Sequence, residues 1–336
     1  MSAREEKEAG NKVLSQTVAV IIVNYNGGQY LEKCLEALSK QSRKPDKVLI
    51  VDNNSDDFHA SRINDRYPQV DILALDENTG FAAANNRAVR LLNGMEWVVL
   101  LNPDAYAQHD WLENFLAGAR SHPDVHYFGC HMLAATENKQ DGTGDVYHIS
   151  GAVWRRDYGQ AVGVKRGEGE IFSPSGAAAL YRRDVFIEAG GFNEAFFCYL
   201  EDIDLGFRLQ LLGYRCFYIP DAVVTHEGAA LVGKHSDFQV YHGHRNLVWT
   251  YVMNMPAPWF WIYLPQHLLY NLASVLLFVY HGKSSVILRS KFDAIKGLPQ
   301  AWRLRRQIQK KSNVDIGKLR KSMAHGFFSP YLNRYE

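Results

Sequence analysis

Four short polar segments hold many of the side chains in this sequence that could do chemistry, and each directly follows an apolar run. They are Asn24-Tyr-Asn-Gly, Asp52-Asn-Asn-Ser, Glu77-Asn-Thr-Gly and Asn102-Pro-Asp. In the last segment, Pro103 ends the apolar run WVVLL because proline has no N–H group for strand pairing. Asp104 is therefore expected at the mouth of an apolar core, where an unpaired charge is costly. We expect a cation or several hydrogen bonds to meet this carboxylate.

A second group of carboxylates stands in the segment YLEDIDLGFRLQLLG, whose pattern predicts a helix over 202–212. Acids at the start of a helix are favoured by its dipole, so Glu201 and Asp202 could be helix-start charges only. They could also serve as an acid or base on a substrate. Asp204 and Arg208 are four residues apart, and this spacing predicts a structural ion pair.

Hydrophobic patterning predicts the elements that must position these residues. Apolar runs rich in β-branched residues indicate strands, and apolar residues at helical spacing indicate helices between them. The predicted strands cover 18–24, 47–51, 70–75 and 97–101, and the predicted helices cover 29–40, 57–66 and 81–92. This alternation is typical of βαβ units with a Rossmann-like, mostly parallel sheet flanked by helices. Ligands bind beyond the carboxyl ends of such strands, so the four polar segments are expected to form one site.

The pattern changes between about residues 125 and 230, where shorter apolar runs alternate with glycine-rich connections. We expect mixed strands here, in a second half of the same domain. With 336 residues, of which 47% are hydrophobic, the chain can bury one large α/β core and still carry an appendage. Its four cysteines are scattered, with no CxxC pair, and are expected to be reduced thiols in a cytosol.

The net charge of +1 hides a strong asymmetry along the chain. Residues 283–321 contain 12 Lys and Arg against two acids, a local charge of +10, which leaves residues 1–282 at about −9. No nucleic-acid-binding motif accompanies the basic segment, so nucleic acid is not an expected partner. The N-terminal residues are polar and lack an apolar signal core, so we do not expect secretion.

An uncharged stretch over 246–282 precedes the basic segment and includes PWFWIYLPQHLLYNLASVLLFVYHG. It is long enough to span a bilayer, but Pro265 interrupts it, and a polar stripe runs along one helical face (His267, Asn271, Ser274 and His281). This pattern favours a helix lying in the membrane interface, or a broken re-entrant pair, over a simple span. A buried helix of a soluble domain is the alternative. Clustered Lys and Arg nearby indicate attraction to an anionic membrane surface.

Taken together, the motifs resemble a known family. VAVIIVNYNGGQYLEKCLEAL, VLIVDNNSDD, ENTGFAAANNRAV, WVVLLNPDA, SGAAALYRRDVF and GGFNEAFFCYLEDIDLGFRLQLLGYRCFYIPDAVVTHEG occur in the order found in family 2 inverting glycosyltransferases of the GT-A fold. The resemblance is strongest to the rhamnosyltransferase-like enzymes of bacterial polysaccharide assembly, and it covers about residues 17–255. It implies a nucleotide-diphosphate sugar donor and an inverting transfer to an acceptor hydroxyl.

The resemblance also implies roles for individual residues. The donor-binding residues are expected to be Tyr25, Asn26, Asp52, Asn54, Asn78, Gly80, Phe81, Asn85, Asn86, Asn102 and Asp104. Asp104 and His226 are expected to hold Mn²⁺ or Mg²⁺ against the diphosphate, although Asn102 replaces the first acid of the commonest Asp-x-Asp motif. Asp202 is expected to be the general base, with Glu201 as an orienting or acceptor-binding acid. The acceptor-binding residues are expected to be Gly176, Ala177, Tyr199 and Glu201.

The resemblance favours L-rhamnose from dTDP-rhamnose as the donor sugar and a lipid-linked or polysaccharide acceptor, with a UDP-hexose donor as the alternative. A nucleotidyltransferase and an inactive sugar-nucleotide-binding protein are the further alternatives. The expected organisation is a polar tail (1–16), a GT-A domain (17–245, with halves 17–124 and 125–245), a helical membrane-associating region (246–322) and a C-terminal tail (323–336). The expected location is the cytoplasmic face of the cell membrane, as a peripheral or monotopic protein.

Overall fold

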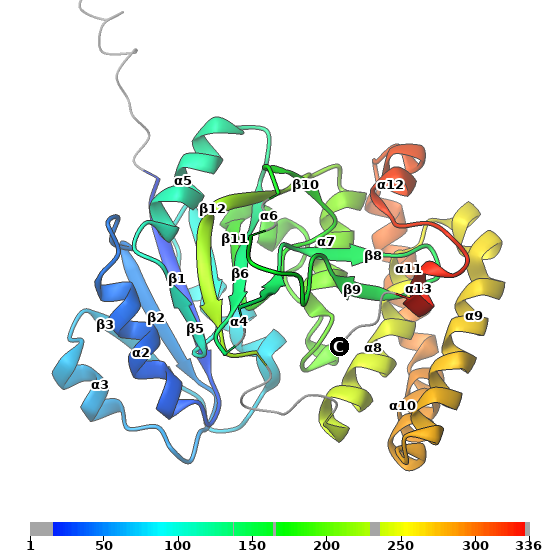
Figure 1. The fold of residues 1–336 in the computed structure, drawn as a ribbon, viewed down its shortest axis with the longest axis horizontal. Coiled ribbons are helices and arrows are strands. Elements are labelled where there is room, and N and C mark those ends of the chain that lie inside the picture. Colours follow the sequence, from blue (N-terminus) through cyan, green and yellow to red (C-terminus); the bar gives the residue numbers. More distant parts are fainter. Residues whose placement is uncertain (1–15, 137, 164–165, 229–235, 333–336) are drawn as a thin grey trace, which may run out of the picture.

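The structure is a computed structural model, and it describes residues 16–136, 138–163, 166–228 and 236–332. Figure 1 shows a central sheet with helices on both of its faces, and a group of helices beside one end of this assembly. The second half of the chain adds further strands to the sheet begun by the first half. One continuous sheet therefore carries both halves of the predicted GT-A domain.

The first half of the sheet is parallel. Its strands are β1 (Val18–Asn24), β2 (Lys47–Asp52), β3 (Val70–Ala74) and β4 (Trp97–Leu101), in the spatial order β4-β1-β2-β3. All four pair in parallel, so their carboxyl ends meet at one edge, as predicted. The predicted strand bounds are confirmed to within one residue.

The second half of the sheet is mixed, as predicted. Here β11 (Ala178–Arg182) runs antiparallel to both β4 and β6 (Tyr127–Ala134), while β12 (Cys216–His226) pairs in parallel with β6. At 11 residues, β12 is longer than the short strands expected here. Five shorter strands complete the described strands. Three pair at the margins of the sheet: β5 (Ala105–Ala107), β7 (Gln140–Gly142) and β10 (Gly169–Ile171). The other two, β8 (Asp145–Tyr147) and β9 (Val153–Arg155), form a separate hairpin.

Each face of the sheet is covered by helices because side chains alternate along every strand. Val18, Val20 and Ile22 of β1 pack on one face against α2 (Gly28–Ser39), α3 (Ala60–Arg66) and α5 (Trp111–Ser121). Ala19, Ile21 and Val23 pack on the other face against α4 (Gly80–Leu91), α6 (Arg183–Glu188) and α7 (Glu201–Leu211). The helices predicted at 29–40 and 81–92 are confirmed, whereas the one predicted at 57–66 begins only at Ala60.

A third core joins the C-terminal helices to this domain. They are α8 (Asp237–Asn254), α9 (Ala257–Tyr280), α10 (Ser284–Lys296), α11 (Leu298–Lys311), α12 (Ile316–Ser322) and α13 (Ser329–Leu332). Ile203 and Phe207 of α7 pack against Leu247 and Tyr251 of α8 in this core. The predicted boundary at residue 245 falls inside α8, which continues through it without a break and packs on the helix that carries the candidate base.

Of the two arrangements expected within 246–282, an interfacial helix or a re-entrant pair broken at Pro265, the described residues do not form the broken pair. Helix α9 is continuous, and Pro265 lies inside it. His267 and Ser274 are buried against the protein, as the polar stripe suggested, and His267 stacks on Tyr251 with ring centroids 3.9 Å apart. His281, by contrast, is exposed beyond the end of the helix. Among the described residues, α9 is the one helix long and apolar enough to cross a membrane.

Candidate active site

A cavity of about 520 Å³ opens at the carboxyl end of β4, where the two halves of the sheet meet. Its lining brings together residues that lie far apart in the sequence, including Asn102, Gly176, Glu201, Asp202 and His226. The backbone explains this meeting, because the N–H of Asn102 donates to the carbonyl of Ala177 across β4 and β11 (2.8 Å). Phe81, Ala177 and Tyr199 also line the cavity.

Asp104 and His226 face each other beside this cavity, both almost fully buried. His226 Nε2 lies 3.4 Å from an Asp104 carboxylate oxygen, and His226 Nδ1 lies 2.8 Å from Asp141, which in turn accepts from Arg155 (2.6 Å). Burial alone would lower the pKa of His226, but the Asp104 and Asp141 carboxylates overcome it and raise that pKa to about 9. Within the protein itself, His226 is therefore the group that lies against the Asp104 carboxylate.

This donor set fits a divalent cation bound against a diphosphate. A carboxylate oxygen and an imidazole nitrogen point at each other, and the second imidazole nitrogen is fixed by a carboxylate, an arrangement typical of metal-ligating histidines. Within the described ranges, however, no group of three or more His, Cys, Asp and Glu side chains is arranged to hold a metal. Two protein ligands, Asp104 and His226, are therefore what the chain offers.

The polar segments after β1 and β2 hydrogen-bond to each other. Asn24 Nδ2 donates to Asp52 Oδ1 (3.2 Å) and to the hydroxyl of Ser55 (3.0 Å), and Asn26 accepts from the backbone N–H of Asp56 (2.8 Å). Asn26 and Asn54 have left-handed backbones, with φ of 52° and 63°, which asparagine tolerates better than most residues. Tyr25 is 45% exposed at this edge. The expected nucleoside-binding residues therefore form one surface.

The segment after β3 is tied to the same surface. Asn53 donates to Asn78 Oδ1 (2.8 Å), and the same oxygen accepts from the N–H of Gly80 (3.0 Å). Two of the expected donor-binding residues, however, direct their amides into the protein. Asn85 donates to the Phe81 carbonyl, while Asn86 donates to and accepts from the Phe192 backbone. Neither lines the cavity in the described structure.

Asp202 and Glu201 lie together at the start of α7, and both line the cavity. Asp202 Oδ2 accepts from the backbone N–H of Gly176 (2.7 Å), which holds its carboxylate at the cavity wall. Burial raises the pKa of Asp202, and the N–H groups of Gly176 and Ile203 partly offset this. Burial, followed by the charge of Asp202, raises the pKa of Glu201 well above its ordinary value. Glu201 Oε2 is buried and has no hydrogen-bond partner among the described residues.

The backbone that leads into α7 is strained. Phe197, Tyr199 and Leu200 have φ of 66°, 68° and 66°, a region that non-glycine residues enter at a cost of about 1–3 kcal/mol each. Strain of this kind persists where the surrounding structure holds the segment in place, and it is common at active sites. We call residues 197–200 the 197–200 loop.

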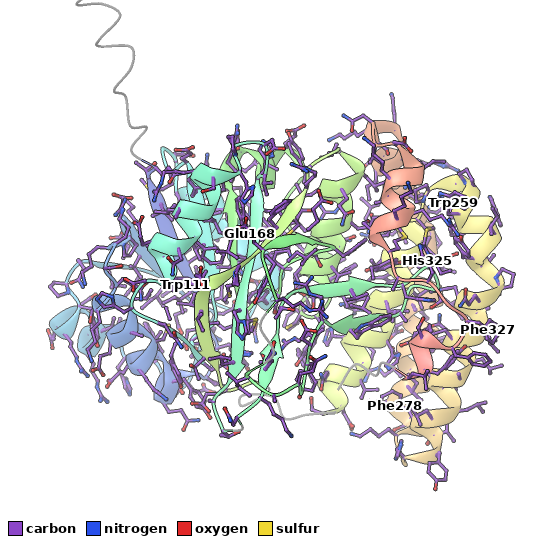
Figure 2. The ribbon with its side chains drawn as sticks, turned by 45° about the horizontal axis from the view of Figure 1, so that its top comes forward. Trp111, Glu168, Trp259, Phe278, His325 and Phe327 are labelled. Atoms are coloured by element: carbon purple, nitrogen blue, oxygen red, sulfur yellow. The ribbon has the colours of Figure 1, made fainter. Side chains whose placement is uncertain are left out.

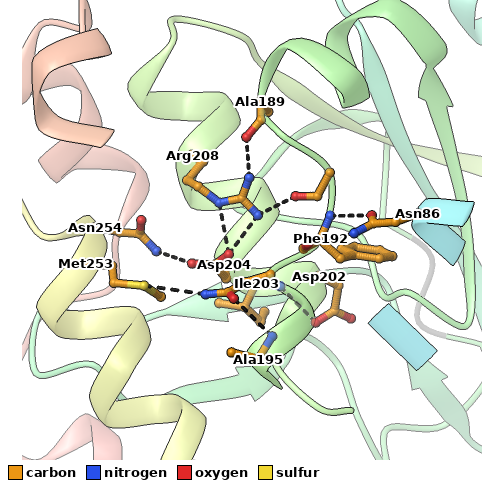
Figure 3. A network of polar contacts seen from close by, with 12 residues as sticks. Asn86, Ala189, Phe192, Ala195, Asp202, Ile203, Asp204, Arg208, Met253 and Asn254 are labelled. Atoms are coloured by element: carbon orange, nitrogen blue, oxygen red, sulfur yellow. Dashed lines mark hydrogen bonds and ion pairs between the residues drawn. The ribbon is translucent and has the colours of Figure 1, made fainter. Parts of the chain in front are cut away.

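Asp204, two residues after Asp202, is entirely buried and does not line the cavity. It accepts two hydrogen bonds from Arg208 (2.9 and 2.7 Å) and one from Asn254 of α8 (2.7 Å), as Figure 3 shows. Arg208 also donates to the Gly191 carbonyl (2.7 Å). The predicted structural ion pair between Asp204 and Arg208 is confirmed.

Sequence reasoning missed three charged residues of the site. Asp141 and Arg155 line the cavity and connect to His226, and Asp145 is buried near Asp202. Burial, and then the charge of Asp202, raises the pKa of Asp145 well above its ordinary value. All three stand in short strands of a glycine-rich region without a regular pattern. The sequence marks them only as charged residues in short segments, and the structure shows that these segments are strands.

The architecture and the polar cavity at the carboxyl ends of the parallel strands define an enzyme of the GT-A type. A family model described as Glycosyl transferase family 2 matches residues 19–190, about half of the chain. The chain belongs to glycosyl transferase family 2, and it is a glycosyltransferase.

Individual relatives agree with this assignment, and one solved structure shares the fold. An N-acetylglucosaminyl-diphospho-decaprenol L-rhamnosyltransferase of Mycobacterium tuberculosis is 30% identical over 244 residues, which is 66% of this chain and 79% of the relative. Rhamnosyltransferase WbbL of Escherichia coli (strain K12) is 26% identical over 220 residues, 60% of this chain and 80% of that one. The mannosyltransferase PcManGT from Pyrobaculum calidifontis, solved in complex with GDP-Man and Mn²⁺, shares the fold with a TM-score of 0.52 at 20% identity, over 88% of this chain and 84% of the other.

Proposed function

We propose that this protein transfers L-rhamnose from dTDP-rhamnose to a hydroxyl of a lipid-linked glycan, with inversion at the anomeric carbon. The observation that carries the proposal is the cavity, because its lining brings Asp202 together with Asn102 and His226. A sugar donor held beside Asn102 and His226 would present its anomeric carbon to an acceptor held beside Asp202. This arrangement permits a single displacement from the face opposite the leaving diphosphate.

In this mechanism Asp202 accepts the proton of the acceptor hydroxyl as the oxygen attacks the anomeric carbon. The new carbon–oxygen bond forms while the bond to the nucleotide diphosphate breaks, so the configuration inverts. Gly176 orients the base through its N–H group. Glu201 contributes a buried carboxyl to the same cavity, where it can hydrogen-bond a second acceptor hydroxyl.

On the donor side, Asp104 and His226 would hold Mn²⁺ or Mg²⁺, and the ion would supply positive charge to the leaving diphosphate. Tyr25, Asn26 and Asp52 would enclose the nucleoside, with Asp52 as a hydrogen-bond acceptor for base N–H or ribose O–H groups. Asn54, Asn78, Gly80 and Phe81 would complete the donor surface. Asn102 would contribute a neutral amide where a second carboxylate is more usual.

The choice of sugar and acceptor rests on the relatives. Two of them are named as rhamnosyltransferases, and one name specifies an N-acetylglucosaminyl-diphospho-decaprenol acceptor. We therefore propose an acceptor with a polyprenyl diphosphate and a terminal N-acetylhexosamine. The apolar side chains of Phe81 and Ala177 at the cavity favour a 6-deoxy sugar, because it presents a methyl group where a hexose presents a hydroxyl.

A donor competition assay tests the sugar and the metal together. Full-length protein is supplied with a synthetic polyprenyl-diphosphate N-acetylglucosamine and with dTDP-rhamnose, UDP-glucose, UDP-galactose or GDP-mannose, and products are identified by mass spectrometry. We expect the highest kcat/KM with dTDP-rhamnose and loss of transfer in saturating EDTA, restored by Mn²⁺ or Mg²⁺. A higher kcat/KM with a UDP-hexose would refute the rhamnosyl assignment, and full activity in EDTA would refute the metal role.

We also propose that the outer face of α9 rests on the cytoplasmic surface of an anionic membrane. Leu268, Leu272 and Leu276 recur at four-residue spacing on α9, and each is more than half exposed. The neighbouring α10 and the C-terminal segment add further exposed apolar side chains, and Figure 2 shows Phe327 at the same edge of the molecule. These are Leu288, Phe292, Ile295, Phe327 and Phe328. None of the four cysteines is paired in a disulfide, which fits a reducing compartment.

Vesicle sedimentation tests the membrane proposal. The triple variant Leu268→Glu, Leu272→Glu and Leu276→Glu should lose most of its binding to vesicles that contain anionic phosphatidylglycerol. Leu91→Glu is the matched control, because Leu91 is an exposed leucine on α4, in a part of the molecule away from α9, and its replacement should leave binding unchanged. Equal binding by the triple variant and the wild type would contradict the proposal.

A further inference from the structure

The left-handed 197–200 loop needs something to hold it, and the donor that does so comes from α8. Asn246 is fully buried, and its Nδ2 lies 3.1, 3.0 and 2.8 Å from the carbonyl oxygens of Phe196, Cys198 and Tyr199. One side-chain amide thus serves three carbonyls of the segment that leads into α7. Without this donor, the buried carbonyls would lack hydrogen bonds, which is costly, and the backbone would rotate them toward other donors.

The orientation of this amide is fixed by the preceding residue. Arg245 Nε donates to Asn246 Oδ1 (3.0 Å), so the oxygen of the amide is occupied and its NH₂ group must face the loop. Arg245 Nη2 also donates to the carbonyls of Ala195 and Phe196 (3.0 and 2.9 Å). The Arg245 guanidinium lies 4.6 Å from the ring centroid of Trp249, so the arginine side chain packs along α8.

The opposite side of the loop rests on the start of α4. The N–H of Ala82 donates to the Phe197 carbonyl (3.1 Å). Gly80 leaves room for Phe197, since a Cβ at Gly80 would lie 2.6 Å from atoms of Phe197. The loop is therefore held between the donor-side helix α4 and the C-terminal helix α8, and its last residue, Leu200, precedes the first turn of α7.

We infer that Asn246, oriented by Arg245, is a positioning residue that holds the 197–200 loop in its left-handed form and thereby places the Asp202 carboxylate against Gly176. This inference rests on the proposed role of Asp202 as the base. It gives α8 a part in catalysis, although the sequence pattern assigned residues from 246 onward to a membrane-associating region. Without the amide, the loop relaxes toward ordinary backbone angles and the start of α7 moves with it.

The test compares Asn246→Ala with Asn254→Ala in the full-length protein. Asn254 is the matched control, because it is a fully buried asparagine of the same helix whose side-chain amide donates to Asp204 (Figure 3) and not to the loop. For each variant, kcat for rhamnosyl transfer, the Kd for dTDP and the melting temperature are measured. A displacement of about 1 Å at a reacting group can cost on the order of 100-fold in rate.

We expect Asn246→Ala to lower kcat by about 100-fold with the Kd for dTDP changed by less than about twofold. Asn254→Ala should lower the melting temperature at least as much, yet keep kcat within about threefold of the wild type. Equal kcat losses in the two variants, or a loss of dTDP binding in Asn246→Ala, would overturn the inference.

A second variant serves if Asn246→Ala does not fold. Arg245→Lys removes the Nε donor to Asn246 and keeps the positive charge, and Arg245 is partly exposed, so folding should be retained. We expect a kcat loss of about 10-fold with unchanged dTDP affinity. Unchanged kcat in this variant would overturn the inference. If instead Asp202→Asn transfers at the wild-type rate, the proposed base is wrong, whatever the Asn246 variants show.

Discussion

The donor side and the acceptor side of the cavity use similar polar residues but are held in different ways. On the donor side, asparagines of neighbouring loops hydrogen-bond to each other, as Asn53 does with Asn78. On the acceptor side, Glu201 keeps a buried oxygen without a partner among the described residues, and the preceding backbone is left-handed at three positions. The donor-side loops therefore hold one another, whereas the 197–200 loop on the acceptor side is held by hydrogen bonds from α4 and α8.

This difference follows from what each side has to do. A nucleotide is bound mainly by hydrogen bonds and stacking, which a preformed polar surface supplies. A general base must be kept partly desolvated to raise its proton affinity, and this requires burial that the local chain does not favour. The comparison teaches that stability and catalysis can be separated by substitutions on the acceptor side. Neighbouring acids of α7 offer the sharpest test.

The largest expected effect is that of Asp202→Asn on transfer. The amide has nearly the same size and can still occupy the place beside Gly176, but it cannot accept the proton. We expect kcat to fall by about 10²–10⁴-fold, the contribution typical of a general base. Donor binding, measured by titration with dTDP, should be unchanged because Asp202 lies on the acceptor side. Near-wild-type transfer would show that Asp202 is not the base, and the acceptor side would then lose the catalytic role that distinguishes it from the donor side.

Asp204→Ala should have the next largest effect, and on stability rather than chemistry. It leaves Arg208 buried without its carboxylate and removes the partner of Asn254. Breaking a buried pair in this way costs about 3–5 kcal/mol, which urea denaturation would measure. The control is Asp184→Ala, which removes an exposed pair with Arg182 and should cost about 1 kcal/mol or less. A small loss in Asp204→Ala would mean that the pair does not anchor α7.

Much of this fold could be predicted from the sequence because its determinants are local. The strands around Val20 and Val99 are continuous apolar runs, and the polar segments after them could be placed at one edge by topology alone. The pairing of Asp204 with Arg208 follows from helical spacing. The family resemblance selected Asp202 and His226 from several equivalent acids and histidines.

The other parts of the candidate site could not be predicted from the sequence, because they depend on contacts between segments that are far apart in the chain. Asp141 reaches His226 across 85 positions of the chain, and Asn246 reaches Tyr199 across 47. Neither residue has a local pattern that distinguishes it from a surface residue. The boundary predicted at 245 rests on composition and falls inside α8. A change in charge composition marks where the chain becomes apolar, but it does not reveal which side chain of α8 contacts the 197–200 loop.

The smallest expected effect, and the most specific, concerns the pH dependence of stability. Burial and Asp202 raise the pKa of Glu201 above its ordinary value of 4.5. Between 4.5 and the raised value, the unfolded chain has released this proton while the folded chain still holds it. The wild type therefore loses stability as pH rises through this window, by up to about 1.4 kcal/mol per pH unit from this group.

Glu201→Gln removes that dependence because an amide does not titrate in this range. We expect the variant to be more stable than the wild type, with a difference that grows from pH 5 to pH 7 in urea denaturation. Glu96→Gln at an exposed carboxyl is the control and should show a constant difference over the same range. The variant should also bind acceptor less well while its affinity for dTDP stays unchanged. A stability difference independent of pH would mean that the acceptor side does not hold a protonated carboxyl, and the contrast with the donor side would then rest on backbone strain alone.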